Sequence, residues 1–476
     1  MAAGPDQRLP IGAAARRLVQ LLVFVLVPTA LGATFWSVSV LWRGAPAATE
    51  IGPVPVFPLK IAAGRRYLVD QNDVPFLIHG EAAWSIIVQL TREEAERYLD
   101  DRRRRGFNLV LVNLLEHKFA DHPPLNVYGQ GPFTSPDDFS TPNEAYFDHA
   151  DWVIRQAEAR GMAVLLCPAY LGFEGGDEGW YQTMVRNGTD KLREYGKYVG
   201  ARYKTHDNLL WLEAGDFTPP ADKLELVDAV AEGIKAGDPR HLHTAHFSPR
   251  TSAIDVAVSG WLDLNVTYTY APVYEKCLAD YNRSDDRPTL LVETTYEDEV
   301  GESTPPSLRA AAYYALLSGA AGQIFGNHWI WQFKPTRWWR ILLHRSWLTA
   351  LDTPGSRSMM HVRSLFAPRA WPSLVPDQRS EVLVEGQGQR GSRDYALLAR
   401  SEDGRLAIAY VPTPRPITID RARLAKPLAA RWYDPTNGTF LEIGEFARSV
   451  TDRATVRPPA ANAAGDSDWV LVLESP

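Results

Sequence analysis

Two acidic residues stand where buried strands are expected to end. Asp216 follows the apolar run LLWLEAG, and Glu293 closes the run TLLVE. A carboxylate in such a place is either paired with an arginine or used for chemistry. Two carboxyl groups that face each other are the minimum needed to cleave a glycosidic bond. One is protonated and assists the leaving oxygen, and the other attacks the anomeric carbon or activates water. We therefore predict that Asp216 and Glu293 form a catalytic pair.

Each member of this pair has a competitor nearby in the sequence. Glu213 precedes Asp216 by three residues, so on an extended strand the two side chains point to opposite faces. If Asp216 reaches the active site, Glu213 faces the helix layer or lies deeper. Glu297 shares the strand parity of Glu293 but stands further out on the loop that follows.

Eight apolar runs alternate with helical segments between residues 57 and 363. Most runs are continuously apolar, as strands covered on both faces must be. Thr91 and Glu94 predict a capping box ahead of one helix, and Gly161 predicts the end of another. Eight strand–helix units in about 300 residues predict a (β/α)8 barrel, whose active sites lie at the C-terminal ends of the strands. The expected strands lie within 75–84, 107–115, 162–170, 209–216, 243–247, 264–270, 289–297 and 322–331.

Polar and aromatic residues near these strand ends are candidates for binding substrate. Tryptophans can stack on sugar rings, although each one also fits core packing. Histidines can hydrogen-bond sugar hydroxyls or satisfy buried polar groups. Glu81, Glu297 and His328 could also separate the pKa values of the catalytic carboxyls. The glycine-rich loop 172–180 is interpreted as a rim of the cleft. The candidates are Glu81, Trp84, Glu116, Asp177, Trp180, His246, Glu297, Asn327, His328 and Trp331.

The sequence pattern changes after about residue 366. Strand-like segments such as YALLARS and RLAIAYVP alternate with the turn signals EDG and TNG, and no helical period is convincing. These features predict an antiparallel β-sandwich over 366–476. The connector RSLFAPRAWPSL is short and apolar, so we expect the sandwich to pack against a barrel domain at 55–365.

The N-terminal segment 1–54 is expected to hold a cytoplasmic stub, a membrane helix and a linker. Residues 18–42 carry no charge and are long enough to cross a bilayer, and Arg16 and Arg17 precede them. We interpret this segment as an uncleaved anchor; the small residues APAA at 45–48 offer cleavage by a signal peptidase as the alternative. In both cases the catalytic domain is exported, either anchored to the membrane or secreted.

Charge and cysteine content exclude other classes of partner. The net charge is −7, and the basic run RRRR at 102–105 is expected to be the solvated end of a helix, so we expect no nucleic-acid partner. Cys167 and Cys277 have no Cys or His at metal-ligand spacing, and we expect neither a metal nor another cofactor. Cys167 lies in an apolar run and fits core packing, with a disulfide between the two cysteines as the alternative.

Motifs spread along the chain resemble those of one known family. They include YLVDQNDVPFLIHGEAAW, LTREEAERYLDDRRRRGFN, NLLWLEAGD, RPTLLVETTYE, GAAGQIFGNHWIWQF and LDTPGSRSMMHVRSLF, and later ARWYDPTNGTF and DWVLVLE. In order and spacing they are similar to the apiosidase-like glycoside hydrolases, formerly a domain of unknown function. That family is often followed by a β-sandwich named a collagen-binding domain. The resemblance covers nearly everything after residue 57.

The resemblance implies a (β/α)8 barrel that hydrolyses glycosidic bonds with retention. It places the acid/base on Asp216 and the nucleophile on Glu293. The family's pattern is altered at positions that include sugar-contacting ones, which leaves the apiose specificity open. Glu81 replaces an aspartate, Glu213 an apolar residue, Thr294 a proline and Asn327 a histidine.

We therefore predict an exported retaining glycoside hydrolase that acts on a plant or bacterial polysaccharide, with an apiosyl or another furanoside unit as a candidate sugar. The alternative is a non-catalytic glycan- or matrix-binding protein built on a degenerate barrel. The presence of both Asp216 and Glu293 argues against that alternative. The name of the sandwich does not lead us to expect collagen as a partner.

Overall fold

The structure, a computed structural model, describes residues 53–257, 259–283, 286–299, 303–333, 346–444, 446 and 452–475. The predicted membrane segment 18–42 lies outside these residues. Among the residues that are described, no helix is long and apolar enough to cross a bilayer. The described chain opens with three short antiparallel strands, β1 (Lys60–Ile61), β2 (Leu68–Val69) and β3 (Pro75–Phe76).

Eight parallel strands form the barrel. Their order is β8-β7-β6-β5-β4-β11-β10-β9, so that strands consecutive in sequence are neighbours and β11 pairs with β4. The amides of Asp263 and Leu264 donate to the carbonyl of His243 and join the two ends of this order. Each strand lies in one of the predicted apolar runs, which confirms the barrel. The strands are β4 (Ile78–Ala82), β5 (Leu109–Asn113), β6 (Ala163–Cys167), β7 (Leu209–Ala214), β8 (His243–His246), β9 (Asn265–Tyr268), β10 (Thr289–Glu293) and β11 (Gly322–Phe325).

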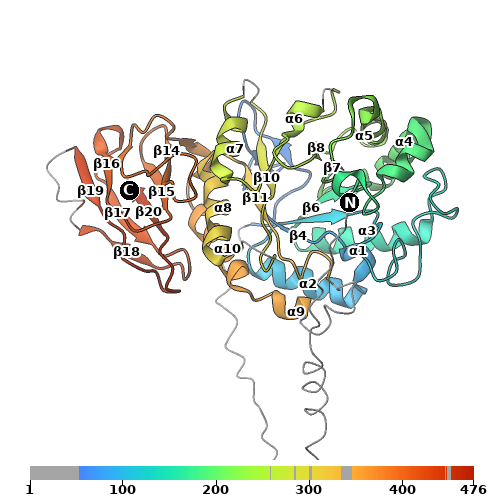
Figure 1. The fold of residues 1–476 in the computed structure, drawn as a ribbon, viewed down its shortest axis with the longest axis horizontal. Helices are drawn as coiled ribbons and strands as arrows, with labels where there is room; N and C mark the ends of the chain where they lie inside the picture. Colours follow the sequence, from blue (N-terminus) through green and yellow to red (C-terminus); the bar gives the residue numbers. More distant parts are fainter. Residues whose placement is uncertain are drawn as a thin grey trace, which may run out of the picture. The chain divides into compact units, whose positions relative to one another are not determined.

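Helices connect the strands and surround them (Figure 1). The predicted capping box is present, because the Thr91 hydroxyl accepts from the Glu94 amide and the Glu94 carboxylate accepts from the Thr91 amide. Gly161 follows its helix in the left-handed conformation, with φ 63°. The helices are α1 (Ile86–Gln89), α2 (Arg92–Arg104), α3 (Glu144–Ala159), α4 (Tyr181–Tyr203), α5 (Leu224–Gly237), α6 (Ala253–Val256), α7 (Val273–Tyr281), α8 (Pro305–Leu317), α9 (Trp347–Ala350) and α10 (Pro354–Phe366).

The basic run 102–105 is not the solvated helix end that the sequence predicts. Arg102 is fully buried, and its guanidinium lies 2.9 Å from the carboxylate of Glu81. It lies on the inner face of α2, seven residues after buried Ala95 and four after buried Tyr98. This spacing follows the helical period, so one arginine of the run turns inward. Arg104, two residues later, keeps 60% of its side chain exposed.

Two antiparallel sheets follow the barrel. A six-stranded sheet has the order β12-β14-β15-β20-β17-β18, and a three-stranded sheet has the order β13-β16-β19. Residues from both sheets form a second hydrophobic core, which includes Ile419, Trp432 and Leu471. This arrangement confirms the predicted sandwich. The strands are β12 (Leu374–Pro376), β13 (Leu383–Glu385), β14 (Leu397–Ser401), β15 (Leu406–Val411), β16 (Ile417–Asp420), β17 (Ala429–Tyr433), β18 (Phe440–Glu442), β19 (Arg453–Val456) and β20 (Trp469–Glu474).

The six-stranded sheet packs on the barrel through α8 and α10, which Figure 1 shows between the two domains. Tyr410 of β15 stacks on Tyr313 of α8, with ring centroids 5.0 Å apart. Arg309 of α8 forms a buried ion pair with Asp468, with a nitrogen–oxygen distance of 2.6 Å. The packed interface that the apolar connector predicts is therefore present.

Both cysteines are buried and free. Cys167 lies in β6 and Cys277 in α7. The disulfide considered from the sequence is not formed, whereas core packing fits both positions.

Candidate active site

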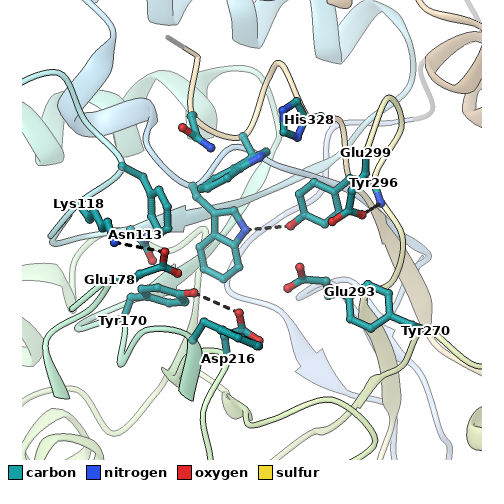
Figure 2. Close-up of a pocket in the computed structure, with 15 residues that line it drawn as sticks. Asn113, Lys118, Tyr170, Glu178, Asp216, Tyr270, Glu293, Tyr296, Glu299 and His328 are labelled. Carbon is teal, nitrogen blue, oxygen red and sulfur yellow. Dashed lines mark hydrogen bonds and ion pairs between the residues drawn. The ribbon is translucent and has the colours of Figure 1, made fainter. Parts of the chain in front are cut away.

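A cavity of about 510 Å³ lies at the C-terminal ends of the barrel strands. Asp216, two residues beyond β7, and Glu293, the last residue of β10, both line it. Figure 2 shows Asp216 beside Tyr170 and Glu293 beside Tyr270, with both carboxyl groups pointing into the cavity. The structure thus brings together the two acids that the sequence predicts as a pair.

A strained turn aims Asp216 into the cavity. Ala214, Gly215 and Asp216 have φ values of 66°, 121° and 58°, a region that L-residues rarely adopt. The ring of Tyr170 packs directly on Gly215, which has no side chain. A Cβ atom at this position would lie only 2.3 Å from that ring. Non-glycine residues in such conformations cost about 1–3 kcal/mol each, and this strain concentrates at functional sites. The end of β7 is therefore built to place the Asp216 carboxyl group.

The surroundings of Asp216 act on its pKa in both directions, and the raising effects are the larger ones. Tyr268 donates to Oδ1 at 2.9 Å, and Tyr170 donates to Oδ2 at 3.3 Å. Burial and then the negative charge of Glu293 raise the pKa of Asp216 to about 6, although His246 and the two tyrosines act in the opposite direction. Asp216 can therefore carry a proton near neutral pH, as a general acid must.

His246 contacts both acids. Its Nδ1 accepts a hydrogen bond from the Asp216 amide at 3.2 Å, and its Nε2 lies 3.1 Å from Oε2 of Glu293. An imidazole that accepts at Nδ1 carries its proton on Nε2, so the N–H side of the ring faces the Glu293 carboxylate. The ring is fully buried. One imidazole therefore holds the backbone of one acid and faces the side chain of the other.

The nearer competitor of Asp216, Glu213, does not line the cavity. Glu213 is buried outside the cavity lining, with Oε1 3.4 Å from Nδ1 of His243. Burial raises its pKa well above the usual range. Asp216 therefore faces the cavity and Glu213 does not, which agrees with the expectation that the two side chains point apart.

Three further predicted binding residues line the same cavity: Trp84, His328 and Trp331. Trp84 is held in place because its indole N–H donates to the hydroxyl of Tyr296 at 3.0 Å. Figure 2 shows His328 on the opposite side of the cavity from Asp216. These side chains combine apolar ring faces with polar edges, which suits contact with sugars.

Other predicted binding residues hold the protein together instead of lining the cavity. Glu297 accepts hydrogen bonds from the Thr353 hydroxyl, from the Gly355 amide and from the Asn327 side chain. Glu297 and Asn327 thus tie the ends of β10 and β11 to the start of α10. Glu81 accepts from Tyr98 and pairs with Arg102.

Three more candidates occupy the loops around the cavity. Glu116 accepts from the Ser85 hydroxyl at 2.8 Å and fixes the loop after β5. Trp180 is buried and packs edge-on against two phenylalanines. Asp177 is highly exposed and pairs with Lys118 at 3.1 Å.

Sequence reasoning missed several residues that line the cavity or hydrogen-bond to its acids. Tyr268 ends β9, and its position at a strand end is the signal that would have identified it. Glu299 stands on the loop after β10, with no distinguishing sequence signal, and its Oε2 accepts from the Tyr296 amide at 2.9 Å. Figure 2 shows Glu299 near Glu293 at the right of the cavity, and Lys118 with Glu178 at its left.

Comparisons with known proteins agree with this geometry. The family model described as Apiosidase-like, catalytic domain matches residues 62–373, and the model of a so-called collagen-binding domain of a collagenase matches residues 375–474. A solved glycoside hydrolase family 5 structure from Bacteroides vulgatus is 25% identical over 88% of this chain and 92% of that chain, with a TM-score of 0.75. A second structure, described as a glycoside hydrolase, is 25% identical over 88% of this chain and 96% of that chain, with a TM-score of 0.74. A search of curated proteins gave no match.

Proposed function

Because this chain belongs to the family of apiosidase-like catalytic domains, we propose that it is a retaining glycoside hydrolase, with Asp216 as acid/base and Glu293 as nucleophile. The observation that carries the proposal is that both carboxyl groups line one cavity in different surroundings. Asp216 is held by two tyrosine hydroxyls in a strained turn, whereas Glu293 faces the imidazole of His246.

In the first step Asp216 donates its proton to the glycosidic oxygen while Glu293 attacks the anomeric carbon. The bond to the leaving group breaks as the bond to Glu293 forms, so the sugar becomes attached to the enzyme. The raised pKa of Asp216 keeps the acid protonated for this step. The Nε2 side of His246 orients the attacking carboxylate.

In the second step water attacks the same carbon, Asp216 takes the proton from that water, and Glu293 leaves as a carboxylate. The structure supports this reversal of roles by a simple electrostatic route. The charge of Glu293 is one of the causes of the raised pKa of Asp216. When Glu293 is esterified to the sugar its charge is lost, so the pKa of Asp216 falls and Asp216 can act as a base.

The cavity suits the end or a branch of a polysaccharide. A volume of about 510 Å³ falls in the range of small-ligand sites and holds only a few sugar units. Trp84, Trp331 and Tyr296 supply aromatic faces for them. An apiosyl or another furanoside unit of a plant or bacterial polysaccharide is the candidate substrate. Residues 18–42 would hold the enzyme on the outer side of the membrane.

The test is a screen of the full chain, in a non-ionic detergent, against aryl furanosides, aryl pyranosides and plant and bacterial polysaccharides. Early products of the first responsive substrate are then analysed by proton NMR for the configuration of the anomeric carbon. We expect retention. Inversion would remove Glu293 as a nucleophile. Glycan binding without hydrolysis across the panel would favour the non-catalytic alternative.

A further inference from the structure

Two arginines share a second cavity, at the opposite end of the barrel from the active site. This cavity measures about 460 Å³, and its lining includes Leu77, Asn108 and Gly161, which precede strands β4, β5 and β6. Arg103 comes from the last turn of α2 and Arg363 from the last turn of α10. The cavity is therefore separate from the catalytic carboxyls.

Neither arginine has an anionic partner among the residues that the structure describes. The residues on either side of Arg103 and Arg104 behave differently, because Arg102 pairs with Glu81 and Arg105 pairs with Asp101, each at 2.9 Å. The acid in the cavity lining is Asp70. Its carboxylate instead accepts hydrogen bonds from the backbone amides of three residues, which are Val56, Asn72 and Val74.

The two guanidinium groups are costly to keep together. Burial and then the charge of Arg103 lower the pKa of Arg363 to about 10, and burial also lowers the pKa of Arg103. Nearby helix C-termini offer only partial negative charge in return. The Arg363 side chain also passes close over Gly106, where a Cβ atom would lie 2.7 Å from its Cδ. Its position is thus built into the packing.

We propose that this cavity binds a phosphate group between Arg103 and Arg363. A phosphate monoester carries close to two negative charges, which matches two guanidinium groups, and the oxygens of any phosphate group fit their planar donor geometry. The cavity is much larger than the anion alone. Val74, Phe76 and Trp371 supply apolar walls, so the phosphate is expected to carry an organic group.

A phosphate monoester free in solution and a phospholipid headgroup, whose phosphodiester carries one negative charge, are two sources of such a phosphate group. Pro53, the first described residue, lines the cavity. The predicted membrane segment 18–42 is separated from Pro53 by residues 43–52 alone, which is the reason for including a lipid among the probes. The experiment distinguishes the two sources by the probe that binds.

The experiment measures the melting temperature of the full chain in a non-ionic detergent. Inorganic phosphate, glycerol 3-phosphate and dioctanoyl phosphatidylglycerol are compared with chloride at equal ionic strength. The variants are Arg103→Gln and, as the matched control, Arg104→Gln, which removes an exposed arginine one residue along the same helix. A probe at a hundredfold excess over its Kd should raise the melting temperature of the wild type by about 3 °C.

We expect this rise in Arg104→Gln but not in Arg103→Gln. In chloride, Arg103→Gln should melt at the wild-type temperature or above it, because the repulsion with Arg363 is gone. A larger effect of the lipid identifies a headgroup site, and a larger effect of the soluble phosphates identifies a solution ligand. The proposal is overturned if no probe stabilises the wild type more than chloride, or if Arg103→Gln gains as much as the wild type.

Discussion

The Nε2 atom of His246 lies 3.1 Å from Oε2 of Glu293. The other nitrogen of the same ring accepts from the backbone amide of Asp216. A residue at the end of β8 therefore contacts two acids, one that follows β7 and one that ends β10. A change in this ring should disturb the chemistry of both acids at once.

His246→Gln should lower kcat by about 10²-fold, because both carboxyls lose a shared support and small misplacements of reacting groups are costly. KM should change much less, since the ring does not line the substrate cavity. Steady-state kinetics on a responsive aryl glycoside measures both constants. The matched control is His243→Gln, a buried histidine on the same strand that faces Glu213. That variant should lose stability but keep its kcat, and an equal loss of kcat in both variants would refute the positioning role.

Glu293→Gln should keep the fold and lower kcat by roughly 10³-fold or more, because an amide of similar shape cannot attack the anomeric carbon. Circular dichroism and the melting temperature serve as the check on folding. A wild-type rate in this variant would remove Glu293 from the mechanism and make Glu297 the next acid to replace.

Asp216→Ala should slow substrates with basic leaving groups about 10²–10⁴-fold and activated aryl glycosides far less. Acid assistance matters most where the departing oxygen is strongly basic. Rates on a series of aryl glycosides with different phenol pKa values give the comparison. Equal losses across the series would assign Asp216 a positioning role.

The rate should fall as pH rises past about 6. Only protonated Asp216 can donate to the leaving oxygen, and burial and the charge of Glu293 place its pKa at about 6. The profile of kcat/KM reports this group in the free enzyme. On an activated aryl glycoside, the alkaline limb of this profile, where kcat/KM falls as pH rises past about 6, should be absent in Asp216→Ala. A limb that persists in the variant would belong to another group.

Asp468→Asn should lower the free energy of unfolding by about 3 kcal/mol, because it leaves the buried guanidinium of Arg309 short of a partner. Urea denaturation followed by tryptophan fluorescence gives the value. The matched control is Asp466→Asn, which removes a more exposed partner of the same arginine and should cost less. A stability loss no larger than that of the control would show that the interface does not depend on the buried pair.

The sequence alone determined the framework of the site. The eight barrel strands are visible as continuous apolar runs, because each strand is covered on both faces. Asp216 and Glu293 could be paired because the strands of a barrel all end at one face, so residues far apart in sequence meet there. Alternation along an extended strand predicted that Glu213 and Asp216 point to opposite faces, whereas the choice of Asp216 rested on the resemblance to the family. The strand positions and the pairing of the two acids need only a local pattern and the geometry of a regular element.

Only the tertiary structure decided which polar residues serve the cavity and which serve the fold. Glu81 and Glu297 stand at or just beyond strand ends like Asp216 and Glu293, yet one is paired with Arg102 and the other with groups at the start of α10. Arg102 and Arg103 are neighbours in one basic run, but one is paired in the core and the other faces a cavity. These outcomes depend on contacts such as that from Arg102 to the carbonyl of Leu351, which is 249 residues away. A side chain's local pattern fixes the face on which it lies, whereas its partner is fixed by which distant segment packs on that face.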